Sequence, residues 1–434
     1  MAAGGTAPGA GSPFRNGPGV TDKTISIGFP YSPNADEAQA ALGNTQNSQG
    51  DPRAVVKALV DDINRTGGVA GRRLVPIYYK VDSQSGETSD QREQTLCEAF
   101  TVDNKVLALF GASGKLLRPC LRKAGVVNVS GSIAQLNEAD FRNAPNYYDT
   151  FALTLDKAAR NLVDQLVAQR YFQGWDSAEG KPGGTLPVKV GVLAPDTSWV
   201  PVVNEIVVPA LKAAGFPVGP DTVRIWKFPK SESDYGAAVA EIQSIVLRFR
   251  SENVTHVLPM EGNSLAFFTP TAEGQGYRPR YGLSGATDAQ GFAGGLVPYR
   301  QLRGAVGVGW LPAVDLPESK QVPAYSGPGR KRCLDVMARA QISFPSNNAK
   351  ATALLLCDAF FSFDGAVESL RGGAISLATF MPALEALGSS YQAAALPIGG
   401  FGPGKRYPVV AGYPWGFSEP CQCFTYTGQR FTLR

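Results

Sequence analysis

Short apolar runs alternate with amphipathic stretches along the first part of this chain. Residues 24–29 (TISIGF) alternate with the period of a β-strand, and residues 73–81 (RLVPIYYKV) indicate another strand. Between them, Asp51 and Pro52 provide an N-cap and a first-turn proline for an amphipathic helix that ends at Gly67. The order strand, helix, strand predicts a βαβ unit.

The same rhythm continues to the end of a fourth strand. A helix is predicted over residues 89–100, with Glu93 as the capping-box partner of Asp90. Two further strands and the helix between them follow at 106–111, 126–129 and 115–124. Apolar residues are consecutive in these strands, as is typical of strands covered on both faces. A parallel sheet is therefore predicted.

A second series of alternating elements begins after Tyr148. Its predicted helices and strands cover, in chain order, residues 156–169, 188–193, 200–214, 222–228, 233–250, 255–260 and 281–284. The two series predict an α/β protein with two Rossmann-like lobes. No Gly/Ser linker separates them, and the sequence turns strongly helical after Trp310. The chain is therefore expected to pass between the lobes more than once.

Charge and composition exclude several classes of protein. The 434 residues carry 41 Lys and Arg against 37 Asp and Glu, with no basic run, so nucleic acid is not an expected partner. The single histidine, His256, excludes a multi-histidine metal site within one chain, and no cofactor is predicted. Because His256 lies in an apolar strand, a structural role is expected for it.

The chain lacks the apolar segments of membrane and signal sequences. No apolar run reaches the roughly 18 residues that span a bilayer. The first residues are rich in Gly, Ala, Pro and Ser and have neither a basic nor an apolar region of the signal-peptide type. Residues 1–19 are expected to form a flexible leader.

Six cysteines are spaced in pairs: Cys97 with Cys120, Cys333 with Cys357, and Cys421 with Cys423. Pairwise spacing favours disulfides and an oxidising compartment. Six unrelated buried thiols remain the alternative, because free cysteine is commonly buried.

Motifs for catalysis and phosphate binding are weak or absent. Residues 399–405 have GxxxxGK spacing, but Arg406 stands where Ser or Thr is needed. A GxSxG nucleophile elbow is absent. Residues 111–114 (GASG), between a strand and a helix, are more typical of a carboxylate cradle than of a dinucleotide site. No catalytic activity is predicted.

Polar and aromatic residues follow many of the predicted strands directly. Open α/β sheets bind ligands at the carboxyl ends of their strands, so residues there are candidates for ligand binding. Together with two residues of the cradle, the candidates are Tyr31, Ser32, Ser113, Gly114, Ser130, Ser132, Trp199, Glu261 and Asp288. Taken singly, each is more often an ordinary loop residue.

The stretch Ile63–Arg73 (INRTGGVAGRR) resembles the IN-x-x-GG-[IV]-x-GR signature of type I periplasmic binding proteins. Residues 20–28 (VTDKTISIG) are similar to the opening of the branched-chain amino-acid-binding members, the Leu/Ile/Val-binding family. The resemblance covers about residues 20–434. It implies two lobes joined by three crossovers, with a ligand in the cleft between them. Such proteins are the solute-binding components of ABC importers and carry out no reaction.

The resemblance also implies how the chain is divided. Residues 20–150 and 315–392 would form the first lobe, and residues 151–314 and 393–434 the second. A disulfide between Cys97 and Cys120 fits the place where such proteins often carry a first-lobe bridge. Cys333–Cys357 would join two helices, whereas Cys421–Cys423 would close a very small ring, and whether that pair is bridged stays open.

Roles for the candidate residues follow from the same resemblance. Tyr31 and the first-lobe serines would hold a ligand carboxylate, while Trp199, Glu261 and the loop 285–288 would line the second lobe. Amino-acid-binding members usually place an acid in that loop to meet the ligand ammonium. Here Ala286 and Thr287 occupy the equivalent positions, and Asp288 follows them.

The function implied is capture of a small molecule, an amino acid or a related carboxylate, amide or aromatic compound, by hinge closure. Delivery to the permease subunits of an ABC importer would follow, with the protein a monomer outside the cytoplasm and lipid anchoring left open. A ligand-sensing extracellular domain and a Rossmann-type transferase are the alternatives. The sequence names neither the solute nor the permease.

Overall fold

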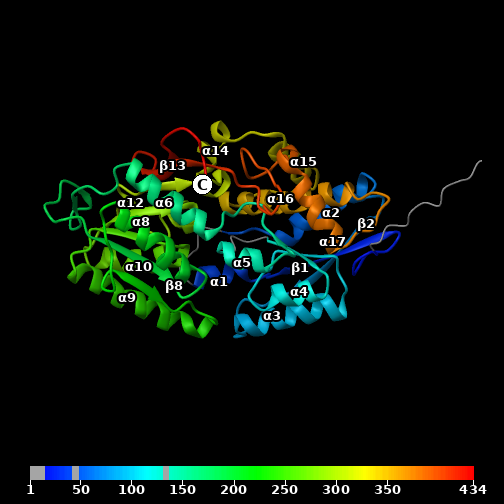
Figure 1. Ribbon diagram of the computed structural model, residues 1–434, viewed down its shortest axis with the longest axis horizontal. Helices are drawn as coiled ribbons and strands as arrows, with labels where there is room; N and C mark the ends of the chain where they lie inside the picture. Colours follow the sequence, from blue (N-terminus) through cyan, green and yellow to red (C-terminus); the bar gives the residue numbers. More distant parts are fainter. Residues whose placement is uncertain (1–14, 42–47, 131–135) are drawn as a thin grey trace, which may run out of the picture.

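Two α/β lobes lie side by side along the longest axis of the molecule (Figure 1). The computed structural model describes residues 15–41, 48–130 and 136–434. The chain begins in the first lobe, drawn in blue and cyan, and continues into the second, drawn in green. The predicted two-lobed α/β fold is confirmed.

The first lobe is built on a parallel five-stranded sheet in the order β2-β1-β3-β4-β5. Its strands are β1 (Thr24–Tyr31), β2 (Arg73–Lys80), β3 (Ala108–Phe110), β4 (Val127–Val129) and β5 (Tyr147–Tyr148). The connecting helices are α1 (Ala35–Ala41), α2 (Pro52–Arg65), α3 (Ser89–Glu98), α4 (Leu117–Lys123) and α5 (Glu138–Asn143). Strands β3 and β4 are buried at every residue, as consecutive apolar residues predict.

Local sequence sets the starts of two of these helices. Asp51 caps α2 as predicted, because its carboxylate accepts a hydrogen bond from the amide of Ala54 at 3.1 Å. The capping box predicted for Asp90 and Glu93 is wrong. Helix α3 starts at Ser89, and the box joins Thr88 to Gln91, which fits the same pattern two residues earlier.

The signature at residues 63–73 joins the end of α2 to the start of β2 through a tight turn. It lies beside β2, the edge strand of the first sheet. Asn64 donates to the carbonyl of Leu74 and accepts from its amide, both at 2.8 Å, as a neighbouring strand would. Gly68 has a φ of +75°, and a Cβ there would lie 2.1 Å from the carbonyl oxygen of Arg72. Only glycine fits this turn, which explains the GG of the motif.

The second lobe carries an eight-stranded sheet in the order β14-β13-β12-β11-β10-β8-β9, with β15 paired to β13. Its parallel strands are β8 (Val190–Pro195), β9 (Val223–Trp226), β10 (His256–Pro259), β11 (Arg280–Ser284) and β12 (Val306–Gly309). Antiparallel strands extend it: β13 (Ala411–Ser418), β14 (Cys423–Tyr426) and β15 (Phe431–Thr432). A separate ribbon pairs β6 (Trp175–Asp176) with β7 (Lys181–Pro182).

Helices cover both faces of this sheet. They are α6 (Leu155–Ala168), α7 (Trp199–Val202), α8 (Val208–Ala213), α9 (Tyr235–Ser251), α10 (Gly262–Gly274), α11 (Ala289–Phe292) and α12 (Tyr299–Leu302). Helices α6 to α8 belong to a core shared with the first lobe, whereas α9 and α10 pack with the opposite face in a separate core. This double cover is the reason why the strands are apolar on successive residues.

The chain returns to the first lobe after β12. The segment contains α13 (Pro312–Asp315), α14 (Glu318–Ala324), α15 (Pro328–Arg339), α16 (Asn347–Glu368) and α17 (Leu377–Ala386). Helix α16 packs against α2, α15 and α17, and the rings of Phe360 and Phe110 stack with centroids 4.6 Å apart. The predicted lobe boundaries stay a prediction. The guanidinium of Arg406 still donates to the carbonyls of Ala144 and Tyr147 in the first lobe before β13 joins the second sheet.

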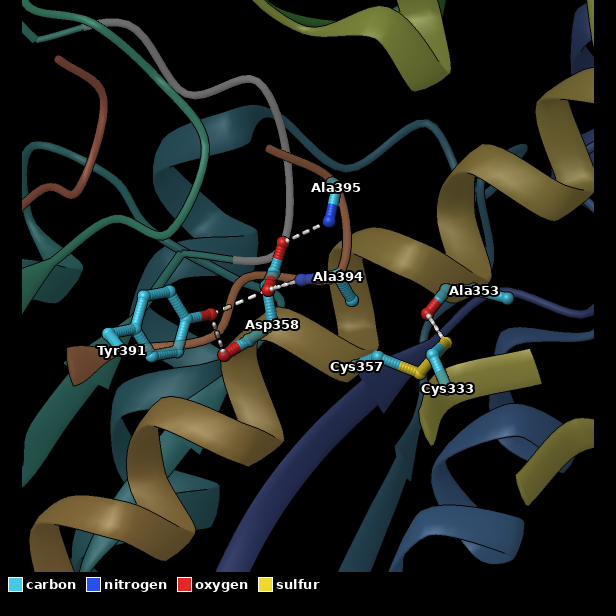
Figure 2. The surroundings of a disulfide bond; sticks show 7 residues. All are labelled: Cys333, Ala353, Cys357, Asp358, Tyr391, Ala394 and Ala395. Carbon is cyan, nitrogen blue, oxygen red and sulfur yellow. Dashed lines mark hydrogen bonds between the residues drawn. A yellow bond between two sulfur atoms is a disulfide. The ribbon is translucent and has the colours of Figure 1, made fainter. Parts of the chain in front are cut away.

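All six cysteines form disulfides: the two pairs expected from the sequence are bridged, and so is the pair Cys421–Cys423, which the sequence left open. Cys97–Cys120 joins α3 to α4, Cys333–Cys357 joins α15 to α16, and Cys421–Cys423 lies between β13 and β14. Figure 2 shows the second bridge beside the buried Asp358.

Candidate ligand-binding site

The lobes contact one another directly where the strands of both sheets end. Ser89, at the start of α3, donates from its amide (2.9 Å) and its hydroxyl (3.1 Å) to the carbonyl of Lys230, in the loop after β9. Ser198, after β8, donates to the carboxylate of Asp140 on α5 at 2.5 Å. These contacts place the candidate site between two lobes that face each other with their strand ends.

Two of the predicted residues lie at the carboxyl end of β1: Tyr31 is its last residue and Ser32 follows it. The ring of Tyr31 packs edge-on against that of Tyr78, and the guanidinium of Arg53 lies 5.1 Å from the centroid of each ring. The hydroxyl of Ser32 lies 2.6 Å from that of Ser83, which joins the loops after β1 and β2. Both residues lie at the ligand-binding edge of the sheet, and contact with a ligand stays a prediction.

The start of α4 is an anion cradle, and the protein's own Glu93 occupies it. The carboxylate of Glu93 accepts from the amides of Leu116 at 2.6 Å and Leu117 at 2.9 Å. A Cβ at Gly114 would lie 1.9 Å from the carboxyl carbon of Glu93, so a larger residue there would displace this carboxylate. Ser113 accepts from Arg118 at 3.3 Å. The amides of Leu116 and Leu117 are therefore already bonded to Glu93. Contact of Ser113 and Gly114 with a ligand stays a prediction.

After β4, Ser130 is buried and belongs to a network around Asp149. The amide of Ser130 donates to the carbonyl of Tyr148 at 3.0 Å, and its hydroxyl hydrogen-bonds to the Asp149 carboxylate. Burial raises the pKa of Asp149, although hydrogen bonds from the amides of Phe151 and Ala152 oppose this effect. Ser132, the other predicted residue of this loop, lies outside the described residues.

In the second lobe, two predicted residues occupy helix starts. Trp199 begins α7 and is 2% exposed. Glu261 is the N-cap of α10: its carboxylate accepts from the amides of Asn263 (2.8 Å) and Ser264 (2.5 Å) and from the Ser264 hydroxyl (2.9 Å). Burial raises the pKa of Glu261, and these bonds counter it. Ligand contact stays a prediction for both.

Asp288 lines a cavity of about 300 Å³ that elements of both lobes enclose. The walls are residues 288–295 after β11, residues 313–317 of the returning segment, and residues 345–351 at the start of α16. Burial and the neighbouring carboxylate of Asp315 raise the pKa of Asp288 to about 7. The cavity therefore holds an acidic wall whose charge changes near neutral pH.

Asp315 is a second buried acid near Asp288, and it was not predicted from the sequence. It is 1% exposed, and its Oδ2 accepts from the amide of Leu311 at 2.7 Å and the hydroxyl of Tyr426 at 2.8 Å. Its Oδ1 has no hydrogen-bond partner among the described residues, and burial raises its pKa to about 7. Residues 306–309 (VGVG) were not recognised as a strand, so the acid that follows them was not considered.

A larger hollow lies elsewhere. It measures about 680 Å³ and runs along α2 and the edge strand β2 on the first lobe. It is lined by Arg53, Lys57, Asp61 and Tyr78 among others, and no residue of the second lobe contributes to it. The sequence predicts a ligand between the lobes, and the smaller cavity at Asp288 is lined by residues of both, so it is the better candidate.

Two features are absent from residues 15–41, 48–130 and 136–434. None of the helices there is both long and apolar enough to cross a membrane. No cluster of three or more His, Cys, Asp or Glu with the arrangement of a metal site occurs in those same ranges.

Several solved structures share this fold. A possible leucine/isoleucine/valine-binding protein from Rhodopirellula baltica SH 1 superposes with a TM-score of 0.62 at 14% identity, over 95% of this chain and 96% of that chain. A periplasmic binding protein type 1 from Bordetella pertussis Tohama I gives 0.60 at 15%, over 94% and 99%. A solute binding protein of an ABC transporter from Rhodopseudomonas palustris HaA2, in complex with p-hydroxybenzoic acid, gives 0.62 at 14%, over 95% and 98%.

The sequence assigns the chain to the same group. The family model for periplasmic binding protein matches residues 40–406, whereas no curated protein matches the sequence. This chain belongs to the periplasmic binding protein family, and its fold is that of the type I, Leu/Ile/Val-binding members.

Proposed function

We propose that this protein captures a small solute between its lobes outside the cytoplasm and delivers it to the permease subunits of an ABC importer. The solute class we favour is an amino acid or a related carboxylate, amide or aromatic compound. The observation that carries the proposal is the cavity at Asp288, which is walled by both lobes and by the segment that joins them. Binding and release, without a chemical reaction, are sufficient for this role.

Hinge closure supplies the mechanism. A ligand that contacts walls from both lobes makes all of its contacts only when the lobes are closed, so it shifts the population toward the closed state. A shift from 1:99 to 99:1 needs about 5.5 kcal/mol of preference for the closed form. The partly exposed ring of Tyr31 favours flat or apolar solutes, and the acid at Asp288 favours a ligand with a hydrogen-bond donor or a positive charge.

A thermal-shift screen tests capture. Amino acids, amides, nucleosides, sugars and aromatic acids are added singly to the purified chain, and one class is expected to raise the melting temperature because it binds the folded state alone. Trp199→Ala is expected to abolish that rise. Leu247→Ala, at an exposed site on α9, is the matched control and should keep it. If no class raises the melting temperature, the capture role is wrong.

Delivery and the lack of a reaction are tested separately. Cells that lack this chain should lose uptake of the identified solute, and the wild-type chain should restore it where Trp199→Ala does not. Mass spectrometry should recover the bound solute chemically unchanged. A solute that is converted during incubation would contradict a binding role.

A further inference from the structure

The three disulfides differ in how far solvent reaches them. Cys333 and Cys357 are both 0% exposed, and Cys97 and Cys120 are partly buried. In the third bridge, Cys421 is exposed while Cys423 is 5% exposed. Thiol–disulfide exchange requires a thiolate to reach a sulfur atom, and Cys421 offers the accessible one.

The third bridge also closes the smallest ring. Only Gln422 separates its cysteines, and Gln422 has a φ of +49°, in the left-handed region that side chains other than glycine and asparagine seldom adopt. A ring this small removes little freedom from the unfolded chain, so it contributes less to stability than bridges between distant residues. The structure therefore holds a bridge that adds little to stability and keeps a backbone conformation that relaxes when the bridge opens.

This bridge sits in the turn between β13 and β14. Cys423 begins β14 opposite Ser418, and the next amide, that of Phe424, donates to Oε1 of Gln290 at 2.8 Å. Gln290 is one of the residues that line the cavity at Asp288. The ring of Phe424 stacks on Trp415 with centroids 4.3 Å apart. The turn is thus connected to the candidate ligand site through Phe424, which follows Cys423, and through Gln290.

We propose that Cys421–Cys423 is a thiol–disulfide exchange site that accepts two electrons from an external dithiol while the other two bridges stay oxidised. A thiolate of the dithiol attacks Sγ of Cys421 and displaces the Cys423 thiolate, which takes up a proton. The second thiolate of the dithiol then attacks the first dithiol sulfur, which is bonded to Cys421 in the mixed disulfide. The Cys421 thiolate leaves and is protonated. The products are a cyclic disulfide and two protein thiols, so two electrons and two protons are transferred.

Opening the ring is expected to loosen the turn locally. Without the bridge, Gln422 is held in its left-handed conformation only by the hydrogen bond from its amide to the carbonyl of Glu419 at 3.2 Å, and Cys423 keeps its pairing with Ser418. The hydrogen bond from Phe424 to Gln290 begins one residue further on, so its protection against hydrogen exchange should fall. This effect is independent of which solute the protein binds.

Graded reduction of the native protein tests the site. The full chain is incubated with increasing dithiothreitol, alkylated, digested and analysed by mass spectrometry. Cys421 and Cys423 are expected to be alkylated at a dithiothreitol concentration about tenfold or more below that needed for the other four cysteines. Reduction of Cys333–Cys357 or Cys97–Cys120 at the same concentration would overturn the proposal, as would a third bridge that resists reduction until the protein unfolds.

Two variants separate exchange from mere exposure. Gln422→Gly accommodates the left-handed backbone and keeps the disulfide, so it should need more dithiothreitol for half reduction than the wild type. The double variant Cys421→Ser/Cys423→Ser should show the faster hydrogen exchange at Phe424 that reduction produces, with unchanged exchange in the first lobe. Half reduction of Gln422→Gly at the wild-type concentration would contradict the role of the ring, and unchanged exchange at Phe424 would contradict loosening of the turn.

Discussion

His256 is buried at the start of β10 with both ring nitrogens bonded. Nε2 lies 3.0 Å from the carbonyl of Tyr171, which only accepts, so Nε2 carries the proton. Nδ1 then accepts from the hydroxyl of Thr255 at 2.9 Å. Burial and the nearby guanidinium of Arg280 lower the pKa of His256 to about 4. The histidine is a neutral structural residue, as the sequence indicated, and it makes folding sensitive to acid.

The expected pH dependence follows from this lowered pKa. The unfolded histidine binds a proton below about pH 6.5, whereas the folded one stays neutral down to about pH 4, so its contribution is complete above pH 6.5 and lost as the pH falls toward 4. The free energy of unfolding should drop by about 3 kcal/mol across this window through His256 alone. Urea unfolding of wild type and His256→Gln at pH 7.5 and 4.5 measures it. An equal pH dependence in both proteins would contradict the assignment.

Asp358, in the middle of α16, is wholly buried and fixes the segment that follows α17. Figure 2 shows its carboxylate accepting from the Tyr391 hydroxyl and from the amides of Ala394 and Ala395, at 2.6, 2.5 and 2.7 Å. Asp358→Ala leaves the amides of Ala394 and Ala395 buried without an acceptor, whereas Tyr391 keeps the main-chain carbonyl of residue 358 at 3.2 Å, and the variant should cost about 3–5 kcal/mol of stability. Asp335→Ala, at a surface ion pair on α15, is the control and should cost under about 1 kcal/mol. Denaturant unfolding measures both, and equal losses would contradict a structural role for Asp358.

At the scale of elements, α5 and the start of α7 hold the lobes together at the site. Ser198 donates to Asp140 of α5, and its carbonyl accepts from Asn137 at 3.4 Å. Together with the bonds between Ser89 and Lys230, these contacts join the two lobes directly. In the proposed hinge closure they would supply some of the preference for the closed state, in addition to what a ligand supplies.

Removing the Ser198 hydroxyl should shift the lobes toward the open state. Ser198→Ala loses one hydrogen bond to a carboxylate, worth about 1 kcal/mol, which corresponds to a roughly fivefold larger ratio of open to closed molecules. Small-angle scattering of the ligand-free protein should report a larger radius of gyration. Ser244→Ala, whose hydroxyl bonds only within α9 at 3.1 Å, is the matched control. Identical scattering curves for the two variants would rule out this contact as a latch.

At the scale of the whole molecule, one apolar core runs from the first sheet through α6 and α16 into the second lobe. The bridges Cys97–Cys120 and Cys333–Cys357 span 23 and 24 residues, and each is expected to add about 3 kcal/mol, mainly by restricting the unfolded chain. Both bridges join neighbouring helices within the first lobe. They stabilise that lobe and leave movement between the lobes unrestricted.

Much of the fold was predictable from local pattern. Most strands and helices up to residue 284 follow hydrophobic periodicity, and the Asp51 cap follows from a side chain that reaches its own backbone. Helices α1, α5 and α10 and the short strands β5, β6 and β7 were not predicted. The sequence analysis missed strand β12, because residues 306–309 alternate with glycine and bury little side chain. It also assigned the α3 capping box to the wrong pair, since two overlapping patterns lie within a few residues.

The candidate site was less accessible to sequence reasoning. Position after a strand placed Asp288 at a cavity shared by both lobes, but the same rule offered Glu261, whose carboxylate caps α10, and Gly114, beside the bonded carboxylate of Glu93. A strand end marks where a ligand can bind, whereas the hydrogen bonds of each side chain decide which residues are free to contact it.

The order of most elements, the pairs Cys97–Cys120 and Cys333–Cys357 and the family were predictable from the sequence, because each depends on a local pattern, on short spacing along the chain or on a continuous motif. The walls of the cavity, the carboxylate of Asp315 and the contacts between Ser198 and Asp140 were decided by the tertiary structure. Their partners are far apart in sequence, and only the packing of both lobes brings them within hydrogen-bonding distance.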